Sequence, residues 1–295
     1  MTTEELFKIV KDEVVGTRDI ITSVDEAEAF HGLFIKVRTK FFEKTMLEIM
    51  PHYRGEQNYG WDIRSGIFRP PLTITDPLIG KELEQKAIAE FENVITTQVG
   101  NNVLRDLFNK EKYGKDWDLL FQAQHAGVKT TLTDWSAEII SALYFATEES
   151  CNPDIEKSDG QLWAFLIPVQ LIIGHNDWPV RNTFYDMNPY DMEQTHLINA
   201  SSYLVNIEQR IFEYRIYRQK GRFVMSSNKE CHMPLNKQDY LQQFIFRLRI
   251  PEEYKKSIRE DLARRGVIRA NMYIDESPAR QQLITEINNK IFKGI

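Results

Sequence analysis

A long helical pattern ends at Pro51, and the character of the chain changes there. Residues 24–50 place apolar side chains at helical spacing with charged residues between them, which predicts one long helix that ends before Pro51. A shorter amphipathic helix is predicted over residues 3–15. Residues 51–80 instead carry prolines, glycines, arginines and aromatic residues with no sustained period, which is typical of short strands joined by loops. The chain must therefore combine helices with strands.

Helices and strands continue to mix after residue 80. Helical spacing returns over residues 81–99 and 134–149, and the second helix follows a polar turn in which Asp134 or Ser136 can cap the first amides. Strands are predicted at residues 161–169, at residues 244–250, and as a pair around Lys220-Gly221 over residues 211–225. Residues 170–206 are expected to form a long, partly structured insertion.

The C-terminal part of the chain is helical again, over residues 252–266 and from Ser277 onward. We therefore predict an α+β fold, with a mixed β core and flanking N- and C-terminal helices. With 295 residues and 42% hydrophobic content, the chain can bury a substantial core.

The overall composition excludes some classes of protein. A formal net charge of -6 argues against a bulk electrostatic affinity for nucleic acid. Two cysteines do not make a disulfide framework, and no apolar stretch reaches the roughly 18 residues that a membrane span requires. We therefore expect a soluble cytoplasmic protein without a membrane partner.

The sequence lacks the motifs of several kinds of catalytic site. The chain has no P-loop, no glycine-rich dinucleotide fingerprint, no zincin motif and no nucleophile elbow. Cys231 and His232 are neighbours, but Cys151 is far away in sequence, so no metal site is expected. Polar residues among apolar ones are concentrated at residues 53–57 and 122–136.

Several segments resemble the FRG domain family, named for a Phe-Arg-Gly motif, in both order and spacing. They are Tyr53-Arg54-Gly55-Glu56-Gln57, Ile67-Phe68-Arg69, Gln124-His125-Ala126-Gly127-Val128 with Thr130, Leu132 and Asp134-Trp135-Ser136, Ala142-Leu143-Tyr144-Phe145-Ala146, and Arg218-Gln219-x-Gly221-x-Phe223. The resemblance covers roughly residues 50–290. We accordingly divide the chain into an N-terminal helical extension, residues 1–50, and an FRG domain with C-terminal strand and helices, residues 51–295.

The motif order is also similar to that of ADP-ribosyltransferases, and this similarity implies their fold and a cleft that binds a nucleotide. NAD is the implied ligand, and ADP-ribosyl transfer or NAD cleavage the implied activity. Arg54 would bind the diphosphate or a ribose through its planar guanidinium. The implied cofactor-binding residues are Arg54, Gly55, His125, Thr130, Thr133 and Trp135.

A reaction at the nicotinamide bond develops positive charge on the ribose, which a nearby carboxylate stabilises. Gln219 occupies the family position by resemblance but carries no charge, whereas Glu213 lies on the same predicted strand, with Glu208 as a further option. The implied catalytic residues are therefore Glu213, Gln219 and His125. Thr131 stands where the family usually has arginine, which puts any anion contact of that arginine in doubt.

Each site residue also has a structural interpretation. Arg54 can be a buried arginine paired with Glu56 or Asp134, Asp134 can be a helix N-cap, and Trp135 can belong to the core. For His125, a structural role and a ligand role are equally supported. A non-catalytic module that recognises a ligand or a protein, for example in phage defence, therefore remains the alternative, and the macromolecular target stays open.

Overall fold

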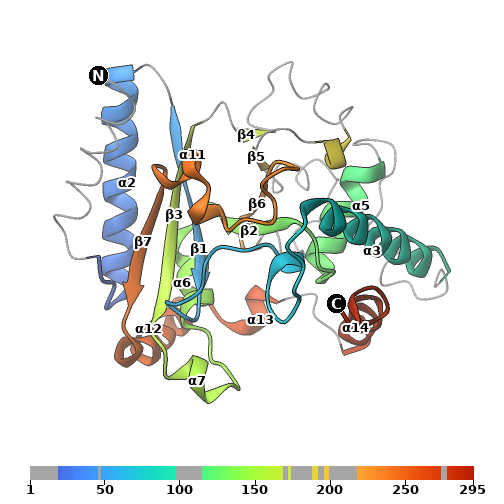
Figure 1. The fold of residues 1–295 in the computed structure, drawn as a ribbon. Coiled ribbons are helices and arrows are strands. Elements are labelled where there is room, and N and C mark those ends of the chain that lie inside the picture. Colours follow the sequence, from blue (N-terminus) through green and yellow to red (C-terminus); the bar gives the residue numbers. More distant parts are fainter. Residues whose placement is uncertain are drawn as a thin grey trace.

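A mainly antiparallel β-sheet lies between two groups of helices (Figure 1). The computed structural model describes residues 19–45, 48–97, 115–168, 172–173, 188–191, 196–198, 218–273 and 278–295. Within these residues the sheet has the strand order β4-β5-β6-β2-β1-β3-β7. The strands are β1 (Ile49–Glu56), β2 (Leu132–Ser136), β3 (Gly160–Pro168), β4 (Ile172–Ile173), β5 (His196–Ile198), β6 (Gly221–Met225) and β7 (Ile245–Ile250). All neighbouring strands are antiparallel except β4 and β5.

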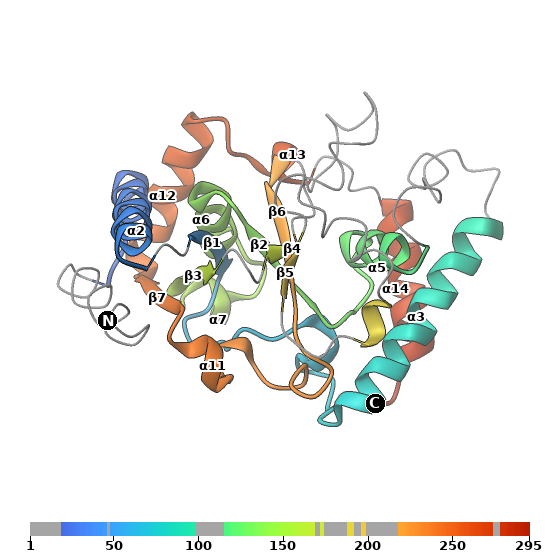
Figure 2. The ribbon, with the colours of Figure 1, turned by 90° about the horizontal axis from the view of Figure 1, so that it is seen from above.

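The helices form two groups, one on each side of the sheet (Figure 2). The first group is α2 (Val24–Thr45), α6 (Ile139–Thr147) and α12 (Glu252–Arg264), and the second is α3 (Pro77–Thr97), α5 (Lys115–Ala126) and α14 (Pro278–Phe292). Shorter helices connect them: η1 (Gly66–Phe68), α7 (Pro153–Glu156), η3 (Pro189–Asp191), η5 (Leu235–Lys237), α11 (Asp239–Gln242) and α13 (Arg269–Met272). The predicted α+β class with flanking helices is confirmed.

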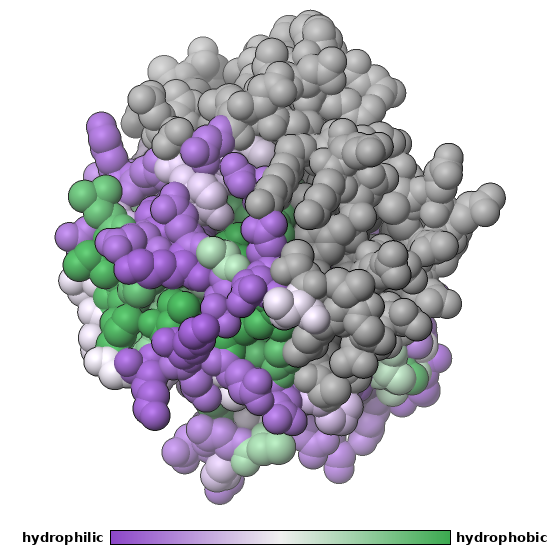
Figure 3. Space-filling model, turned by 90° about the vertical axis from the view of Figure 1, so that its right-hand side faces the viewer, coloured by the Kyte–Doolittle hydropathy of each residue, from purple (hydrophilic) through white to green (hydrophobic). Residues whose placement is uncertain are grey.

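The hydrophobic core has two parts, and β2 and β6 contribute to both. Trp135 and Val224 pack with the first helix group, whereas Leu132, Phe223 and Met225 pack with the second. The face on which α3 and α14 lie is mainly hydrophilic where it is described, with smaller hydrophobic areas between the polar side chains (Figure 3). None of the described helices has the length and apolar character that a membrane span requires.

The predicted helix over residues 24–50 is too long. α2 ends at Thr45 and β1 begins at Ile49, so Pro51 lies inside a strand rather than after a helix. Eight residues of β1 pair with β3, and this pairing outweighs the helical spacing of the last few residues. At Pro51 the strand has a partner on one side only, a position at which a sheet tolerates proline.

The predicted helix over residues 134–149 begins too early. Asp134, Trp135 and Ser136 belong to β2, whose residues all pair with β6, and α6 begins only at Ile139. Asp134 is therefore not an N-cap. Ser136 does act near the helix start, because its Oγ accepts a hydrogen bond from the amide of Glu138 at 3.0 Å.

Other predicted elements are confirmed: β3, β7, α3, α12 and α14 lie where the patterns placed them. Gly266 follows α12 with φ +80°, as a left-handed cap requires. The predicted strand pair around Lys220-Gly221 is described only from residue 218, and there β6 is its second strand. Residues 3–15, most of 170–206 and 211–217 lie outside the described residues.

Candidate functional site

A cleft opens where β1 and β2 diverge. In the described structure these strands pair at Tyr53↔Ser136 alone, whereas β1 pairs along its whole length with β3, and β2 with β6. Next to this point lies a cleft of about 420 Å³, lined by β1, β2, β6 and the loop after α5. The divergence leaves strand edges and their side chains facing the cleft.

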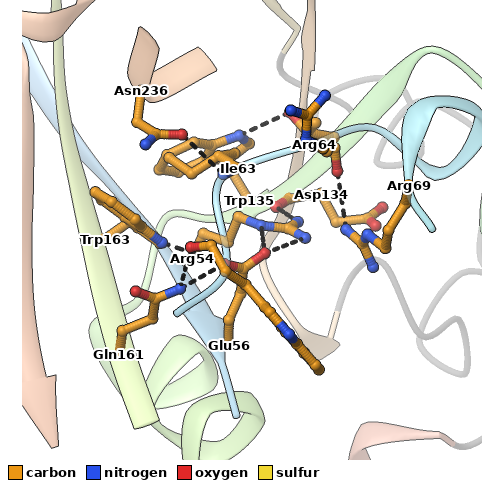
Figure 4. Close-up of polar contacts among 12 residues, drawn as sticks. Arg54, Glu56, Ile63, Arg64, Arg69, Asp134, Trp135, Gln161, Trp163 and Asn236 are labelled. Atoms are coloured by element: carbon orange, nitrogen blue, oxygen red, sulfur yellow. Dashed lines mark hydrogen bonds and ion pairs between the residues drawn. The ribbon is translucent and has the colours of Figure 1, made fainter. Parts of the chain in front are cut away.

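Arg54 bridges the two diverging strands (Figure 4). Its Nη1 donates to the carbonyl oxygen of Asp134 at 2.7 Å, and its Nε and Nη2 lie 3.1 and 3.0 Å from Glu56 Oε1. The side chain lines the cleft but is only 9% exposed. The structural interpretation of Arg54, pairing with Glu56 and Asp134, therefore describes most of its contacts.

Glu56 is held by a buried polar network. Its second carboxylate oxygen accepts hydrogen bonds from Gln161 Nε2 at 2.8 Å and Trp163 Nε1 at 3.2 Å (Figure 4). Gln161 in turn accepts from Arg247 Nε at 2.8 Å, and the Arg247 guanidinium lies 3.5 Å from the centroid of the Tyr59 ring. Because both Glu56 oxygens have donors, the network fixes the orientation of Arg54.

His125 and Gln219 reach the same cleft from distant parts of the chain. His125 lies in the last turn of α5 and is 7% exposed. The side chain of Gln219 donates through Nε2 to the backbone carbonyl oxygen of Met272 at 2.6 Å. The backbone carbonyl oxygen of Gln219 accepts a hydrogen bond from Ser136 Oγ at 2.6 Å. Gln219 thus ties the start of β6 to α13.

The two predicted threonines differ. Thr133 lines the cleft, where its Oγ1 accepts from Trp135 Nε1 at 3.0 Å. Thr130 is not brought to the cleft, because its buried hydroxyl bonds to Gln124 Oε1 and accepts from the amide of Leu132 at 3.1 Å. Trp135 lines the cleft, yet its ring is 3% exposed and packs on Phe165, so it belongs mainly to the core.

Gly55 lines the cleft and also has a packing role that the sequence did not indicate. Its missing side chain makes room for α6, since a Cβ there would lie 1.7 Å from the carbonyl oxygen of Ala142 and 2.7 Å from the amide of Ala146. The glycine thus allows a close approach of α6, and Gly55 also lines the cleft, where its contact with a ligand stays a prediction.

Comparison with known families gives one match. Residues 51–155 match the FRG domain. The chain contains an FRG domain. No curated protein and no solved structure matches the chain, so the resemblance to the ADP-ribosyltransferase fold remains a prediction.

The FRG domain supplies only part of the cleft. Arg54, His125 and Asp134 lie within the matched residues, whereas Gln219, Arg222 and Tyr273 line the cleft from beyond them. β3, the main partner of β1, also lies beyond the match. Segments on both sides of residue 155 must therefore fold together to form the cleft.

Asp134 is an acidic residue of this FRG domain whose place in the cleft the sequence did not indicate. Asp134 was assigned to a helix start, but it is exposed on β2, and Gln124 Nε2 donates to both of its carboxylate oxygens at 3.0 and 3.1 Å. The alternation of residues along a strand would have placed this carboxylate opposite the buried Thr133 and Trp135. Glu213 and Glu208, the carboxylates named from sequence, lie outside the described residues.

Basic side chains outnumber acidic ones around the cleft. Arg54, Arg69, Lys129 and Arg222 line it, against Glu56 and Asp134. Burial lowers the pKa of Arg69, the charge of Arg54 lowers it further, and the charges of Glu56 and Asp134 oppose this shift. Burial and then the charge of Arg69 lower the pKa of Lys129, while burial lowers that of Arg222 to about 10. Arginine side chains stay cationic in proteins, so Arg54, Arg69 and Arg222 favour an anionic ligand.

The two cysteines differ in exposure. Cys151 is exposed, whereas Cys231 is buried, and burial raises the pKa of its thiol to about 11. In the parts of the chain that the structure describes, no group of three histidine, cysteine, aspartate or glutamate side chains could hold a metal ion. Neither Cys151 nor Cys231 lines the cleft.

Proposed function

We propose that the cleft binds a nucleotide, that NAD is this ligand, and that the protein transfers ADP-ribose or cleaves NAD. The observation that supports the proposal best is the convergence of Arg54, His125 and Gln219, from three distant parts of the chain, on one cleft with a cationic lining. A cationic cleft attracts the diphosphate that joins the two halves of a dinucleotide. The cleft volume of about 420 Å³ also lies in the range of small-molecule sites.

Asp134 is the residue that we assign to the chemical step. When the nicotinamide–ribose bond breaks, nicotinamide leaves with the bonding electron pair, and an oxygen or nitrogen nucleophile bonds to the ribose carbon and loses a proton. Positive charge develops on the ribose before the new bond is complete, and a carboxylate stabilises it. Asp134 has an exposed carboxylate in the cleft, oriented by the neutral amide of Gln124, whereas Glu56 is buried and its charge is already paired with Arg54.

The test uses NAD labelled in its ADP-ribose part, incubated with the purified protein alone and with cell lysate. We expect nicotinamide release or label transfer that Asp134→Asn reduces about 100-fold, because removing one stabilising group at a reacting centre has costs of this order. Asp154→Asn, at an exposed position outside the cleft, is the matched control and should retain activity. An absence of NAD binding, nicotinamide release and label transfer by the wild-type protein would overturn the proposal.

A recognition module without catalysis is the second candidate. Two features of the described site favour it: Arg54 and Glu56 form an ion pair with each other, and Gln219 carries no charge. In this case NAD or ADP-ribose would bind, Asp134→Asn would leave the affinity nearly unchanged, and no nicotinamide would be released. A calorimetric titration beside the activity assay separates the two candidates.

A further inference from the structure

Two cations lie side by side at the cleft on neighbouring segments. Arg69 follows η1, and Lys129 lies in the loop between α5 and β2. The segments are joined by the amide of Ile67, which donates to the carbonyl oxygen of Thr130 at 3.2 Å. A Cβ at Gly66 would lie 3.6 Å from the Cα of Lys129, in ordinary contact. The two side chains therefore share one part of the cleft lining.

In the described part of the chain, neither cation forms an ion pair with an acidic residue. Among the described residues, no carboxylate oxygen lies within 4.0 Å of the charged nitrogen atoms of Arg69 or Lys129. Arg69 donates through Nη2 to the carbonyl oxygen of Arg64 at 2.9 Å, a neutral acceptor (Figure 4). Arg54, by contrast, is occupied by Glu56 and Asp134. The positive charges of Arg69 and Lys129 repel each other, and the charges of Glu56 and Asp134, which act on Arg69 from beyond ion-pair distance, oppose part of this effect. An anion bound between the two cations lowers the repulsion further.

The loop that carries Lys129 is held in place by α14. Asn288 donates through Nδ2 to the carbonyl oxygen of Gly127 at 3.0 Å and accepts from the amide of Lys129 at 3.1 Å. Gly127 has φ +104°, which a residue with a side chain adopts only with strain. The Lys129 backbone is thus fixed before any ligand arrives, and binding there needs little ordering of the loop.

We propose that Arg69 and Lys129 form a subsite for the diphosphate group of a nucleotide, in place of Arg54, to which the motif resemblance assigns this role. The inference rests on the proposed function for the identity of the nucleotide, but the subsite itself requires only a diphosphate. The planar guanidinium of Arg69 binds two oxygens of one phosphate, and the ammonium of Lys129 neutralises the charge of the other as a point charge.

The test is a calorimetric titration of the full chain with inorganic pyrophosphate, adenosine, ADP and ADP-ribose. We expect Arg69→Gln and Lys129→Gln each to weaken pyrophosphate, ADP and ADP-ribose binding about tenfold or more, as loss of a charge-assisted hydrogen bond does. Adenosine, which has no phosphate, should bind all variants equally. Lys157→Gln removes one positive charge at an exposed position outside the cleft and should leave every affinity unchanged.

Arg69→Lys keeps the charge and should restore part of the lost affinity, which a purely structural role of Arg69 would not explain. Circular dichroism is used to confirm that both glutamine variants are folded. If both then bind pyrophosphate with wild-type affinity, the subsite proposal is wrong, and NAD binding is judged separately. Failure of the wild-type chain to bind pyrophosphate would overturn the subsite as well. Binding of pyrophosphate through Arg69 and Lys129 without binding of NAD or ADP-ribose would uphold the subsite and refute the proposed function.

Discussion

Tyr53 departs from the Phe of the family motif, and its hydroxyl has a specific partner. The side chain is fully buried, and its oxygen lies 2.7 Å from Nδ1 of His31 on α2. Burial lowers the pKa of His31 below its ordinary value, with an opposing effect of Glu138, and burial raises the pKa of Tyr53. Both groups are thus neutral at physiological pH, and the extra hydroxyl of the tyrosine is not left unpaired.

This pair predicts a pH dependence of stability. Because the folded chain holds His31 neutral, the unfolded chain takes up a proton first as the pH falls below 6.5. The stability that neutral His31 supports is present above pH 6.5 and is lost as the pH falls below it. Denaturant unfolding at about pH 7.5 and about pH 5 should show a larger loss in the wild type than in His31→Gln. Equal losses in both proteins would contradict the prediction.

Thr131 occupies the position of the family arginine, but it does not face the cleft. It is 1% exposed, and its amide and Oγ1 lie 2.5 and 2.9 Å from Oε1 of the buried Glu84. Lys81 Nζ donates to Thr131 Oγ1 at 3.2 Å, so a cation from α3 is present beside Glu84. Thr131 therefore belongs to a buried hydrogen-bonded group with Glu84 and Lys81 rather than to the cleft lining.

At the scale of elements, α6 packs closely enough on β1 to exclude any side chain at Gly55. Gly55→Ala would place a Cβ against the backbone of Ala142, which cannot move without displacing the helix. We expect a loss of about 3 kcal/mol in the free energy of unfolding, at the upper end of overpacking effects. Denaturant unfolding measures it.

Gly32→Ala is the matched control for this prediction. Gly32 lies within α2 and nothing lies within 4 Å of a Cβ built there. Alanine should raise the free energy of unfolding by about 0.5–1 kcal/mol, because glycine weakens helix interiors. If Gly55→Ala is as stable as Gly32→Ala, the packing argument for the motif glycine is wrong.

The elements could be predicted from sequence where side-chain spacing decides the structure, and less well where pairing between distant strands decides it. α12 and α14 have their own charges, caps and apolar stripes, so local patterns located them. The spacing of Asp134 and Trp135 is compatible with a helix, and the sequence pattern therefore predicts one there. Their place in β2 depends on β6, about ninety residues later, as the register Asp134↔Phe223 shows.

The candidate site, too, could be predicted where local motifs carry its residues and not where contacts between distant segments decide them. Arg54, His125 and Gln219 could be grouped in advance because short motifs carry them. Arg69 and Lys129 could not be recognised as neighbours, since their segments meet through the backbone hydrogen bond between Ile67 and Thr130, which no side-chain pattern reports. The role of Gly55 depends on how close α6 lies, which no local pattern reports.

At the scale of the whole molecule, the matched FRG domain does not contain a complete sheet. Residues 51–155 include β2 and most of β1 but neither β3 nor β6, their main partners. A fragment of residues 51–155 should therefore remain unfolded, because both strands would lose their ladders and core partners. Far-UV circular dichroism and amide NMR dispersion measure this, with the full chain as control. A cooperative unfolding transition of the fragment would contradict the prediction.

The single pairing between β1 and β2 also bears on how such a protein can change during evolution. Arg54 and Glu56 belong to the β1–β3–β7 ladder, and Asp134 and Arg222 belong to the β2–β6 ladder. Each ladder is complete without the other, so substitutions along the facing edges change the space between them without removing ladder bonds. A lineage can therefore acquire a new ligand by altering these edges while both strand registers are inherited unchanged.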